Sequence, residues 1–385
     1  MKIKRNIDLV AVLKKKSVLL LGPRGTGKSF YIRSQLENCL VINLLKSKEF
    51  LALSNNPSLL EEMIIDSNQI VVIDEIQKIP KLMDEVHWLI EEKNIKFLLT
   101  GSSARKLTAN STNLLAGRAW LARMFPFNWV ELQNANKTST LNLKKILQFG
   151  TLPAVWTSTD PLENLDNYIQ TYIEAELKAE GIIRKIPEFI RFLKQAALQS
   201  GELLVFQNVA SDAGIPVSTV KQHYAILEET MIGFNLEPWL ESKKRKAIGT
   251  GKFYFFDTGV LNVISENKPE NENSPVWGNR FEHFIINEVR CANFYLRLKK
   301  KIYYWRSTSN FEVDLIFGKT AIEIKSTRKV SDKHLSGLKA LREENHFEKF
   351  IIVSQDPIER IRDGIIHMNY VAFLKKLWLN KIDES

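Results

Sequence analysis

The chain has 385 residues, of which 44% are hydrophobic and 25% charged, so it is long enough for two or three globular domains. Its formal net charge of +10 favours a polyanionic partner such as nucleic acid, and its two cysteines, Cys39 and Cys291, lack metal-ligand spacing and favour a reducing compartment. No apolar stretch approaches the roughly 18 residues of a membrane span, which excludes a membrane-spanning class, so we expect a cytoplasmic protein with no membrane partner.

A glycine-rich loop follows the apolar run Ser17–Leu21. The loop reads Gly22, Pro23, Arg24, Gly25, Thr26, Gly27, Lys28 and Ser29, the pattern G-x-x-x-x-G-K-[ST] between a strand and a helix. Its glycines let backbone N–H groups turn toward an anion, Lys28 can reach the β- and γ-phosphates, and Ser29 can ligate Mg²⁺. The loop therefore predicts a site for ATP with Mg²⁺, and the alternative is a glycine-rich turn that binds nothing.

Apolar runs alternate with helical patterns in the first third of the chain. Such runs, separated by helices, predict a parallel sheet that is buried on both faces. The expected strands are Ser17–Leu21, Cys39–Leu44, Gln69–Asp74 and Ile95–Thr100. We therefore expect an α/β nucleotide-binding domain that ends near residue 136, where the sequence becomes polar.

Two acidic residues stand at the end of the third expected strand. At the carboxyl edge of a parallel sheet, Asp74 would hold Mg²⁺ and Glu75 would orient and polarise the attacking water. The alternative is a solvated turn or a helix cap.

Two further residues of this domain could act on the nucleotide. Ser102, after the fourth strand, could contact the γ-phosphate or the water, or it could cap the next helix. Arg118 could stabilise the charge that develops on the transferred phosphate, within its own chain or from a neighbouring subunit of a homo-oligomer. A surface salt bridge is the alternative role for Arg118.

These segments resemble a known group of ATPases. The segments Gly22–Ser29, Val71–Glu75, Thr100–Ser103 and the Gly117-Arg118 step before Phe125 look like the AAA-type ATPases of bacteria and archaea that carry a restriction-endonuclease-like C-terminal domain. The resemblance covers essentially the whole chain. It implies a P-loop AAA-type ATPase domain, a helical and winged-helix domain and a PD-(D/E)xK nuclease-like α/β domain, which we place at residues 1–136, 137–262 and 263–385.

The middle of the chain has the pattern of a helix–turn–helix. We expect helices at Phe206–Ala213 and Ser218–Glu229, with a turn over residues 214–216. The second helix would turn one set of residues to the core and the other outward or toward its flank, where they could read the major groove. The core-facing set is Val220, Tyr224 and Leu227. The set that lies outward or toward the flank is Lys221, Gln222 and His223.

A basic hairpin is expected next. Its strands would be residues 233–239 and 252–257, and its tip would hold the cations Lys243, Lys244, Arg245 and Lys246. Cations on a hairpin tip can contact DNA phosphates without reading sequence. The alternative is a solvated charged loop.

Two strands with alternating apolar residues follow, at Phe311–Phe317 and Ala321–Lys325. Gly318-Lys319 between them suits a type II′ turn, a register that places Asp314 opposite Glu323 and Glu312 opposite Lys325. Like charges directly opposite each other destabilise a hairpin. We therefore expect a divalent metal ion between Asp314 and Glu323.

Two more residues complete this site. Lys325 shares a face with Glu323 and could orient water or stabilise developing charge, while Glu282 lies on the apolar face of an expected helix, Asn279–Arg290, and needs a partner. The set resembles the PD-(D/E)xK phosphodiesterase core, although Val313 stands before Asp314 where that motif has Pro. The resemblance implies that Glu282, Asp314 and Glu323 bind Mg²⁺ or Mn²⁺ and that Lys325 is catalytic. The alternative is a hairpin salt-bridged through Glu312 and Lys325.

Together these features favour an ATP-hydrolysing, DNA-binding protein whose C-terminal domain cleaves DNA with a metal ion under nucleotide control, assembled as a homo-oligomer. The competing hypothesis is a nucleotide-controlled switch or scaffold whose C-terminal domain binds DNA or protein without cutting. A partner other than nucleic acid, such as a toxin or a membrane protein, is a third hypothesis.

Overall fold

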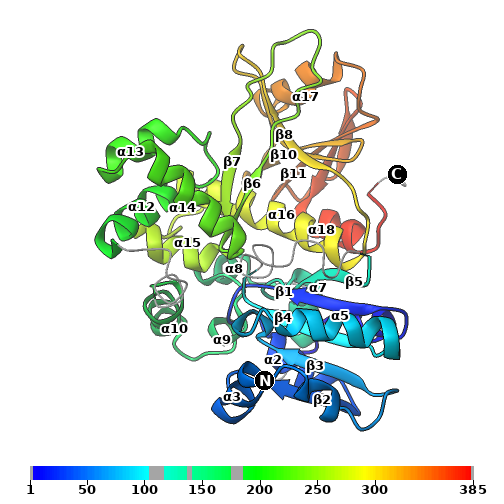
Figure 1. Ribbon diagram of the computed structural model, residues 1–385. Coiled ribbons are helices and arrows are strands. Elements are labelled where there is room, and N and C mark those ends of the chain that lie inside the picture. The colour runs from blue at the N-terminus through cyan, green and yellow to red at the C-terminus, as the bar shows by residue number, and fades with distance from the viewer. Residues whose placement is uncertain (1–2, 104–116, 137–140, 175–184, 383–385) are drawn as a thin grey trace. The chain divides into compact units, whose positions relative to one another are not determined.

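The computed structural model describes residues 3–103, 117–136, 141–174 and 185–382 (Figure 1). The chain forms two compact units, the first from residues 2–127 with 226–232 and the second from residues 128–225 with 233–385. The expected division into three domains stays a prediction. Within the described ranges, no helix is both long and apolar enough to cross a membrane.

The first unit is built on a parallel sheet with strand order β2-β3-β4-β1-β5. Its elements are α1 (Leu9–Leu13), β1 (Ser17–Leu21), α2 (Lys28–Gln35), β2 (Cys39–Asn43), α3 (Ser47–Asn55), α4 (Leu59–Glu62), β3 (Ile70–Asp74), η1 (Ile76–Lys78), α5 (Leu82–Lys93), β4 (Phe97–Gly101) and β5 (Ala119–Arg123). The predicted α/β class and four parallel strands are confirmed, and the edge strand β5 is an addition. Strands β3 and β4 are fully buried at Val71 to Ile73 and at Phe97 to Leu99, as expected for a sheet covered on both faces.

This topology positions the candidate nucleotide residues. Strand β1 leads into the glycine-rich loop, β3 ends at Asp74, and β4, which lies between β1 and β3, ends at Gly101. Because the three strands are parallel, the segments that follow them lie along one edge of the sheet.

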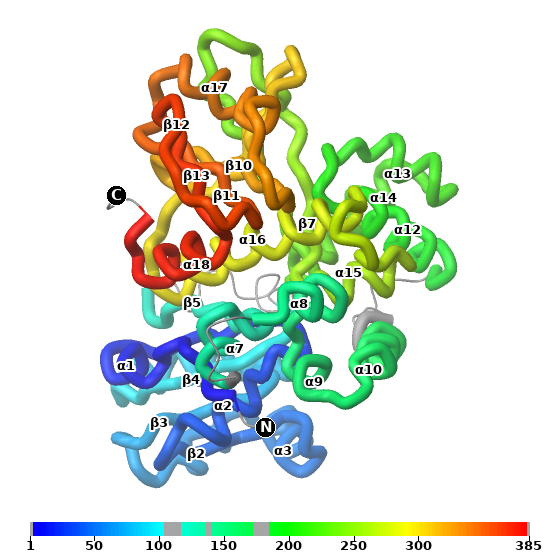
Figure 2. Tube along the Cα trace, turned by 180° about the vertical axis from the view of Figure 1, so that it is seen from behind, coloured from blue at the N-terminus to red at the C-terminus, as the bar shows by residue number. Residues whose placement is uncertain are grey.

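The second unit combines helices, a two-stranded sheet and a six-stranded sheet (Figure 2). Its first elements are α7 (Trp129–Asn136), α8 (Leu143–Phe149), α9 (Pro153–Trp156), α10 (Pro161–Tyr168), η2 (Ile169–Glu174), α12 (Ile186–Leu198), α13 (Phe206–Ala213), α14 (Val217–Glu229, of which residues 226–229 belong to the first unit), β6 (Gly233–Leu236), β7 (Lys252–Phe255) and α15 (Thr258–Ser265). The elements that follow are α16 (Pro275–Tyr295), β8 (Ile302–Arg306), β9 (Glu312–Phe317), β10 (Thr320–Lys325), η3 (Asp332–Leu335), α17 (Ser336–Arg342), β11 (Lys349–Ser354), β12 (Arg360–Arg362), β13 (Ile365–Asn369) and α18 (Tyr370–Trp378).

The expected helix–turn–helix elements are present as α13 and α14, with Gly214 in the left-handed conformation between them (φ +67°). Val220, Tyr224 and Leu227 are buried, and Lys221 and Gln222 are exposed, as predicted. Whether these elements make a winged helix stays a prediction.

The prediction that His223 faces outward is wrong. Its side chain is buried, and its ring lies edge-on to Phe189 and beside Phe192, with 5.0 Å between ring centroids in both cases. Burial lowers the pKa of His223. The physical reason is helical spacing: residue 223 lies three positions after Val220 and four before Leu227, so it belongs to the apolar stripe.

The six-stranded sheet has the order β12-β13-β11-β10-β9-β8. Helix α17 packs against β9 and β10, whereas α16 packs against β10, and α18 packs against β11 and β13. Strands β9 and β10 form the predicted hairpin: Phe317 pairs with Thr320 and Leu315 with Ile322, around Gly318 at φ +62°. The pairs beside the turn therefore have the predicted register, and the pairing of Asp314 with Glu323 and of Glu312 with Lys325 stays a prediction.

The connection between β6 and β7 covers the edge strand β8. Trp239 N donates to Tyr304 O (2.7 Å), and Ile248 N donates to Arg306 O (2.8 Å). An uncovered edge strand offers unpaired N–H and C=O groups to other chains, so this connection protects the sheet.

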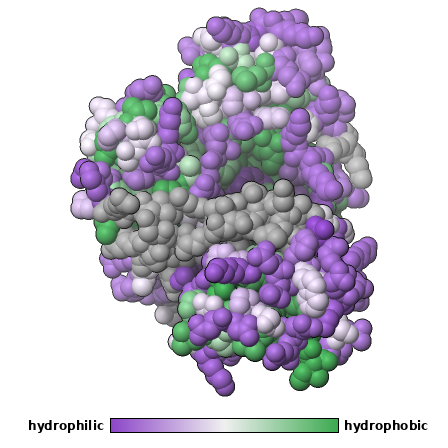
Figure 3. Space-filling model, viewed as in Figure 1, coloured by the Kyte–Doolittle hydropathy of each residue, from purple (hydrophilic) through white to green (hydrophobic). Residues whose placement is uncertain are grey.

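The basic tip of this connection is held by a carboxylate. Glu344 accepts hydrogen bonds from the Ser242 hydroxyl and from the backbone N–H groups of Lys243, Lys244 and Arg245. The Arg245 guanidinium pairs with Glu343 (3.0 Å), so the tip is tied to the segment that follows α17, and its contact with DNA stays a prediction. The side chains of Lys243, Lys244 and Lys246 are exposed. Hydrophilic residues cover much of the described surface that Figure 3 shows.

A close backbone contact between α17 and β9 predicts the effect of Gly337→Ala. A Cβ at Gly337 would lie 1.7 Å from the backbone oxygen of Glu312, which outweighs the usual gain in helix propensity. We expect a loss of about 1–3 kcal/mol in the free energy of unfolding, measured by urea denaturation. Gly249→Ala is the matched control, because no atom lies within 4 Å of its Cβ position. Equal stability of the two variants would contradict the contact.

Candidate nucleotide site and carboxylate cluster

The loop between β1 and α2 has the geometry of an anion-binding loop. Gly25 and Gly27 have positive φ values, 73° and 95°, which glycine adopts at little cost. Gly22 leaves no room for a side chain, since a Cβ would lie 2.5 Å from the Met124 carbonyl oxygen. The loop ends at the N-terminus of α2, which carries partial positive charge.

Lys28 and Arg5 fix this loop from two sides. The Lys28 ammonium donates to the carbonyl oxygens of Gly22 and, at 3.1 Å, Pro23. The Arg5 guanidinium donates to the Thr26 carbonyl oxygen and, at 2.7 Å, to that of Phe125, and Arg5 is buried. Nothing in the local sequence marks Arg5, which lies 21 residues before its partner Thr26.

Asp74 brings the predicted Mg²⁺ ligands together. Ser29 Oγ donates to Asp74 Oδ2 (3.0 Å), and the Thr100 hydroxyl donates to Asp74 Oδ1. Hydroxyl and carboxylate oxygens are the hard donors that Mg²⁺ prefers. The residues present therefore fit a Mg²⁺–nucleotide complex.

Glu75 is held in an uncommon backbone conformation beside Asp74. Its φ is +65°, which is rare for a residue with a side chain and is found often at functional sites. Its carboxylate accepts from the Gln77 amide and, at 3.4 Å, from the Ser102 hydroxyl. Both acids are buried, and Glu75 makes no side-chain cap, so the solvated-turn and helix-cap alternatives are wrong.

Sequence reasoning missed Gln77. Its amide nitrogen bridges Glu75 and the Ser102 hydroxyl (3.1 Å), and its position two residues after Glu75 was the available signal. The alternative that Ser102 caps the next helix concerns residues 104–116, which lie outside the described residues. Arg118 pairs with Glu91, as the salt-bridge alternative expects, and its role toward phosphate stays a prediction.

A cavity of about 810 Å³ lies between the N-terminal segment and α2. Its lining includes Arg5, Asn6, Asp8, Phe30, Ser34 and Gln35. The cavity therefore combines an aromatic ring with hydrogen-bonding groups, next to the helix that begins with Lys28 and Ser29.

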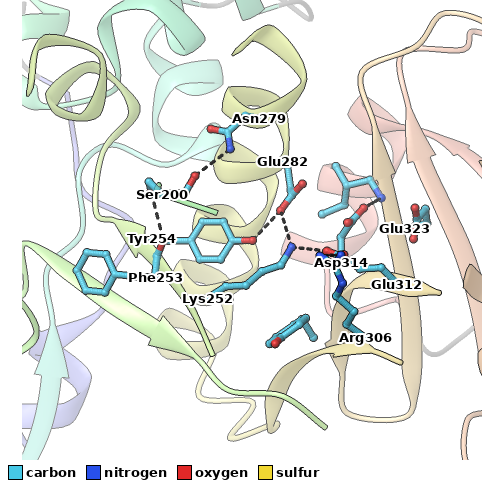
Figure 4. Close-up of polar contacts among 12 residues, drawn as sticks. Ser200, Lys252, Phe253, Tyr254, Asn279, Glu282, Arg306, Glu312, Asp314 and Glu323 are labelled. Atoms are coloured by element: carbon cyan, nitrogen blue, oxygen red, sulfur yellow. Dashed lines mark hydrogen bonds and ion pairs between the residues drawn. The ribbon is translucent and has the colours of Figure 1, made fainter. Parts of the chain in front are cut away.

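Figure 4 shows the carboxylates of the second unit around a buried lysine that the sequence analysis missed. Lys252, from β7, pairs with Glu312 and lies 3.8 Å from Glu282 Oε1. Tyr254, two residues along the same strand, donates its hydroxyl to Glu282 (2.6 Å). Period-two alternation places Lys252 and Tyr254 on one face of β7. Only the three-dimensional structure shows which residues of other elements contact that face.

Lys325 is the second cation of this cluster. Its ammonium lies 2.9 Å from Asp314 Oδ2 and 2.7 Å from Glu323 Oε1, and the Ile324 backbone N–H also donates to Asp314 (2.7 Å). Glu312 pairs with Lys252 and with Arg306 (3.1 Å). The hairpin is therefore salt-bridged, but not through the Glu312–Lys325 pair that the sequence suggested.

Burial and neighbouring charges together raise the pKa values of Glu282, Glu323 and Lys252. Burial raises the pKa of Glu282 to about 7 although Lys252 opposes the shift, and burial together with Asp314 raises the pKa of Glu323 well above its usual value. For Lys252, burial lowers the pKa, but Glu282 and Glu312 outweigh it and the net pKa is raised.

The cluster as arranged does not fit a metal ion. In the part of the chain that is described, no group of three or more His, Cys, Asp and Glu side chains could hold one. Lysines already pair with these acids: Lys325 with both Asp314 and Glu323, and Lys252 with Glu282 and Glu312. Their joint role as metal ligands stays a prediction.

The glycine-rich loop, the acids after β3 and the parallel sheet define a P-loop α/β nucleotide-binding domain. Residues 14–133 match the family described as an AAA domain, so the first part of the chain is similar to AAA-type domains. Residues 140–271 and 277–373 match two families described as domains of unknown function, DUF8612 and DUF4143.

Similar proteins add little to this assignment. An uncharacterized protein of Haemophilus influenzae is 23% identical over 295 residues, which cover 71% of each chain. The Orc1 protein of Aeropyrum pernix in complex with DNA is 14% identical with a TM-score of 0.27, over 68% of this chain and 92% of that one. A signal transduction ATPase with a tetratricopeptide repeat sensor from Pyrococcus horikoshii is 15% identical with a TM-score of 0.27, over 77% and 48%. Similarity at these TM-scores carries neither a fold nor a function to this chain.

The geometry around Glu75 predicts that Glu75→Gln keeps ATP affinity but slows hydrolysis. The amide preserves size and hydrogen bonding but cannot polarise water as a carboxylate does, so kcat should fall by roughly 10²-fold or more. The check is steady-state ATPase activity together with ATP binding. Glu92→Gln, at an exposed position on α5, is the control. Normal turnover by Glu75→Gln would remove Glu75 from this role.

Proposed function

We propose that this chain is an ATP hydrolase whose nucleotide state controls how its other unit binds DNA. The observation that carries the proposal is the contact between Ser29 and Asp74 at the edge of the sheet, with Glu75 beside it. The match of residues 14–133 to an AAA domain supports the same conclusion.

Each residue of the nucleotide site has a role in this proposal. When bound, Mg²⁺ neutralises phosphate charge. Lys28 contacts the β- and γ-phosphates, Ser29 and Asp74 hold the ion, and Glu75 accepts a hydrogen bond from the attacking water while Gln77 and Ser102 keep its carboxylate in place. The cavity beside α2 receives the base and the sugar. Arg118 acts on the phosphate of a neighbouring subunit.

DNA is the partner that charge favours. The net charge is +10, and the exposed ammonium groups of Lys243, Lys244 and Lys246 extend from a tip that Glu344 fixes through the backbone. Cations held on a fixed backbone can contact phosphates with a smaller loss of conformational entropy on binding. Lys221 and Gln222 on α14 are the candidates for contacts with bases.

Metal-dependent DNA cleavage is the second candidate function. The observation that favours it is the hairpin register, which brings Asp314, Glu323 and Lys325 to one place. We favour binding without cleavage because Lys252 and Lys325 already compensate the carboxylates.

DNA binding can be tested by charge reversal. Changing Lys243, Lys244 and Lys246 together to Glu should weaken DNA affinity at least ten-fold and flatten its dependence on salt, because up to three phosphate contacts are lost. Fluorescence anisotropy at several salt concentrations gives both quantities. Changing Lys14, Lys15 and Lys48, which are exposed in the first unit, is the matched control. The same loss in both variants would mean that only net charge matters.

The ATPase proposal and the cleavage candidate are separated by two substitutions. Lys28→Ala should abolish ATP hydrolysis, and Asp314→Ala should leave it intact. Both are checked by phosphate release with and without DNA, alongside incubation of supercoiled and linear DNA with Mn²⁺. Absence of ATPase activity in the wild type would contradict the proposal, and cleavage that Asp314→Ala removes would establish the second candidate instead of binding alone.

A further inference from the structure

The strongest unexplained feature of the second unit is the position of Lys252. Its side chain is 4% exposed, and its ammonium lies among acids contributed by α16 and β9 (Figure 4). The ammonium also lies 5.3 Å from the centre of the Tyr304 ring, on whose electron-rich face a cation is favoured. A lysine is almost never buried this far without charged partners.

The charges explain why a cation is needed there. Four carboxylates take part in the ion pairs of this cluster, and three cations face them: the carboxylates belong to Glu282, Glu312, Asp314 and Glu323, and the cations to Lys252, Lys325 and Arg306. With every group ionised, the formal balance is three minus four, or minus one, and the raised pKa values of Glu282 and Glu323 mean that protons neutralise part of this charge. Removing Lys252 makes the balance one unit more negative, and a metal ion could supply the missing positive charge.

The positions of the partners separate Lys252 from the other cations. Arg306 reaches Glu312, and Lys325 lies between Asp314 and Glu323. Among the described residues, Lys252 is the cation whose ion pairs join Glu282 of the helix to Glu312 of the hairpin. In the nuclease-like arrangement that the sequence resembles, a metal ion would join the same helix acid, Glu282, to Asp314 and Glu323 of the hairpin, whereas Lys252 joins Glu282 to Glu312 of that hairpin.

We propose that Lys252 takes the place of the divalent ion, so that this carboxylate cluster is a self-neutralised site that excludes a metal. Lys252 thereby has a role that neither ATP hydrolysis nor DNA binding requires, although it lies outside the PD-(D/E)xK pattern. Lys252 begins β7, which pairs with β6. A metal ion could enter only if the first residue of β7 moved away from α16 and β9.

One oxygen of the cluster could argue for a metal. Glu323 Oε2 is buried and has no hydrogen-bond partner within the described ranges. Figure 4 shows Glu323 on the far side of Asp314 from Glu282, and the other oxygen of Glu323 is bound by Lys325. A single ion would therefore have to displace lysine contacts before it could bridge these acids.

Manganese titration of the nucleotide-free 385-residue chain tests the proposal. Lys252→Met keeps most of the side-chain volume but removes the charge, so it should bind one Mn²⁺ at least ten-fold more tightly than the wild type does, measured by electron paramagnetic resonance. Adding Asp314→Asn to Lys252→Met should abolish the gain. Lys339→Met is the matched control, because Lys339 pairs with the exposed Asp363 in the same unit and its loss should change nothing.

Circular dichroism would show whether Lys252→Met folds. If it does not, Mn²⁺ binding by the wild type still tests the proposal. Mn²⁺ binding by the wild type that Asp314→Asn removes would overturn the proposal, and binding that is insensitive to Asp314→Asn supports it. A folded Lys252→Met variant that gains no ion would also overturn it. Failure of the ATPase proposal would show itself separately, as absence of ATP hydrolysis in the wild type.

Discussion

One buried carboxylate, that of Asp74, holds the nucleotide site together. A carboxylate taken out of water is costly unless hydrogen bonds replace those it loses. Two neutral hydroxyls, from Ser29 and Thr100, supply them, and these residues come from two other parts of the sheet edge. Hydroxyls satisfy the oxygens without cancelling their negative charge. The site therefore combines order with an uncompensated charge, which is what a divalent ion needs.

The carboxylate cluster of the second unit solves the same problem in the opposite way. Its acids are stabilised by ammonium and guanidinium groups, which satisfy the oxygens and also cancel most of their charge. Both sites contain buried acids on strands or directly after them, so a sequence pattern treats them alike. Their electrostatics differ because the donors are neutral in one and cationic in the other. This difference, more than the number of acids, determines at which site the binding of a metal ion is favourable.

Features set by neighbours in sequence were predictable. Apolar runs gave the strands of the first unit, and strand β1 was predicted over the residues that form it, Ser17–Leu21. The hairpin register followed from Gly318, which accepts a positive φ, together with alternation on both strands. Asp74 was predicted to approach Ser29 because motif spacing and the parallel sheet place both on one edge.

Features set by distant partners were not predictable from one sequence. Arg5 holds the phosphate loop from before β1, and Lys252 reaches Glu312 across 60 residues. His223 was misassigned because one residue of a stripe can be polar when rings such as Phe189 surround it. In each case the local pattern is compatible with an exposed residue. Only the packing of one element against another determines whether that residue is buried and which partners it contacts.

The path of the chain from β6 to β7 gives these distant contacts a consequence. The connection hydrogen-bonds to β8, and its tip is fixed by Glu344 near the end of α17. The same connection then leads into Lys252 and thus into the carboxylate cluster. The exposed cations of the tip and the buried cation of the cluster therefore belong to one continuous segment, anchored at both ends to the six-stranded sheet.

This shared backbone couples the tip to the cluster. Suppose that the segment has a second conformation and that a ligand binds the tip more tightly in it. Binding of that ligand would then also weaken or strengthen the ion pairs of Lys252 with its acids. The coupling would be reciprocal: an ion that displaced Lys252 would alter the affinity of the tip for its ligand by the same factor.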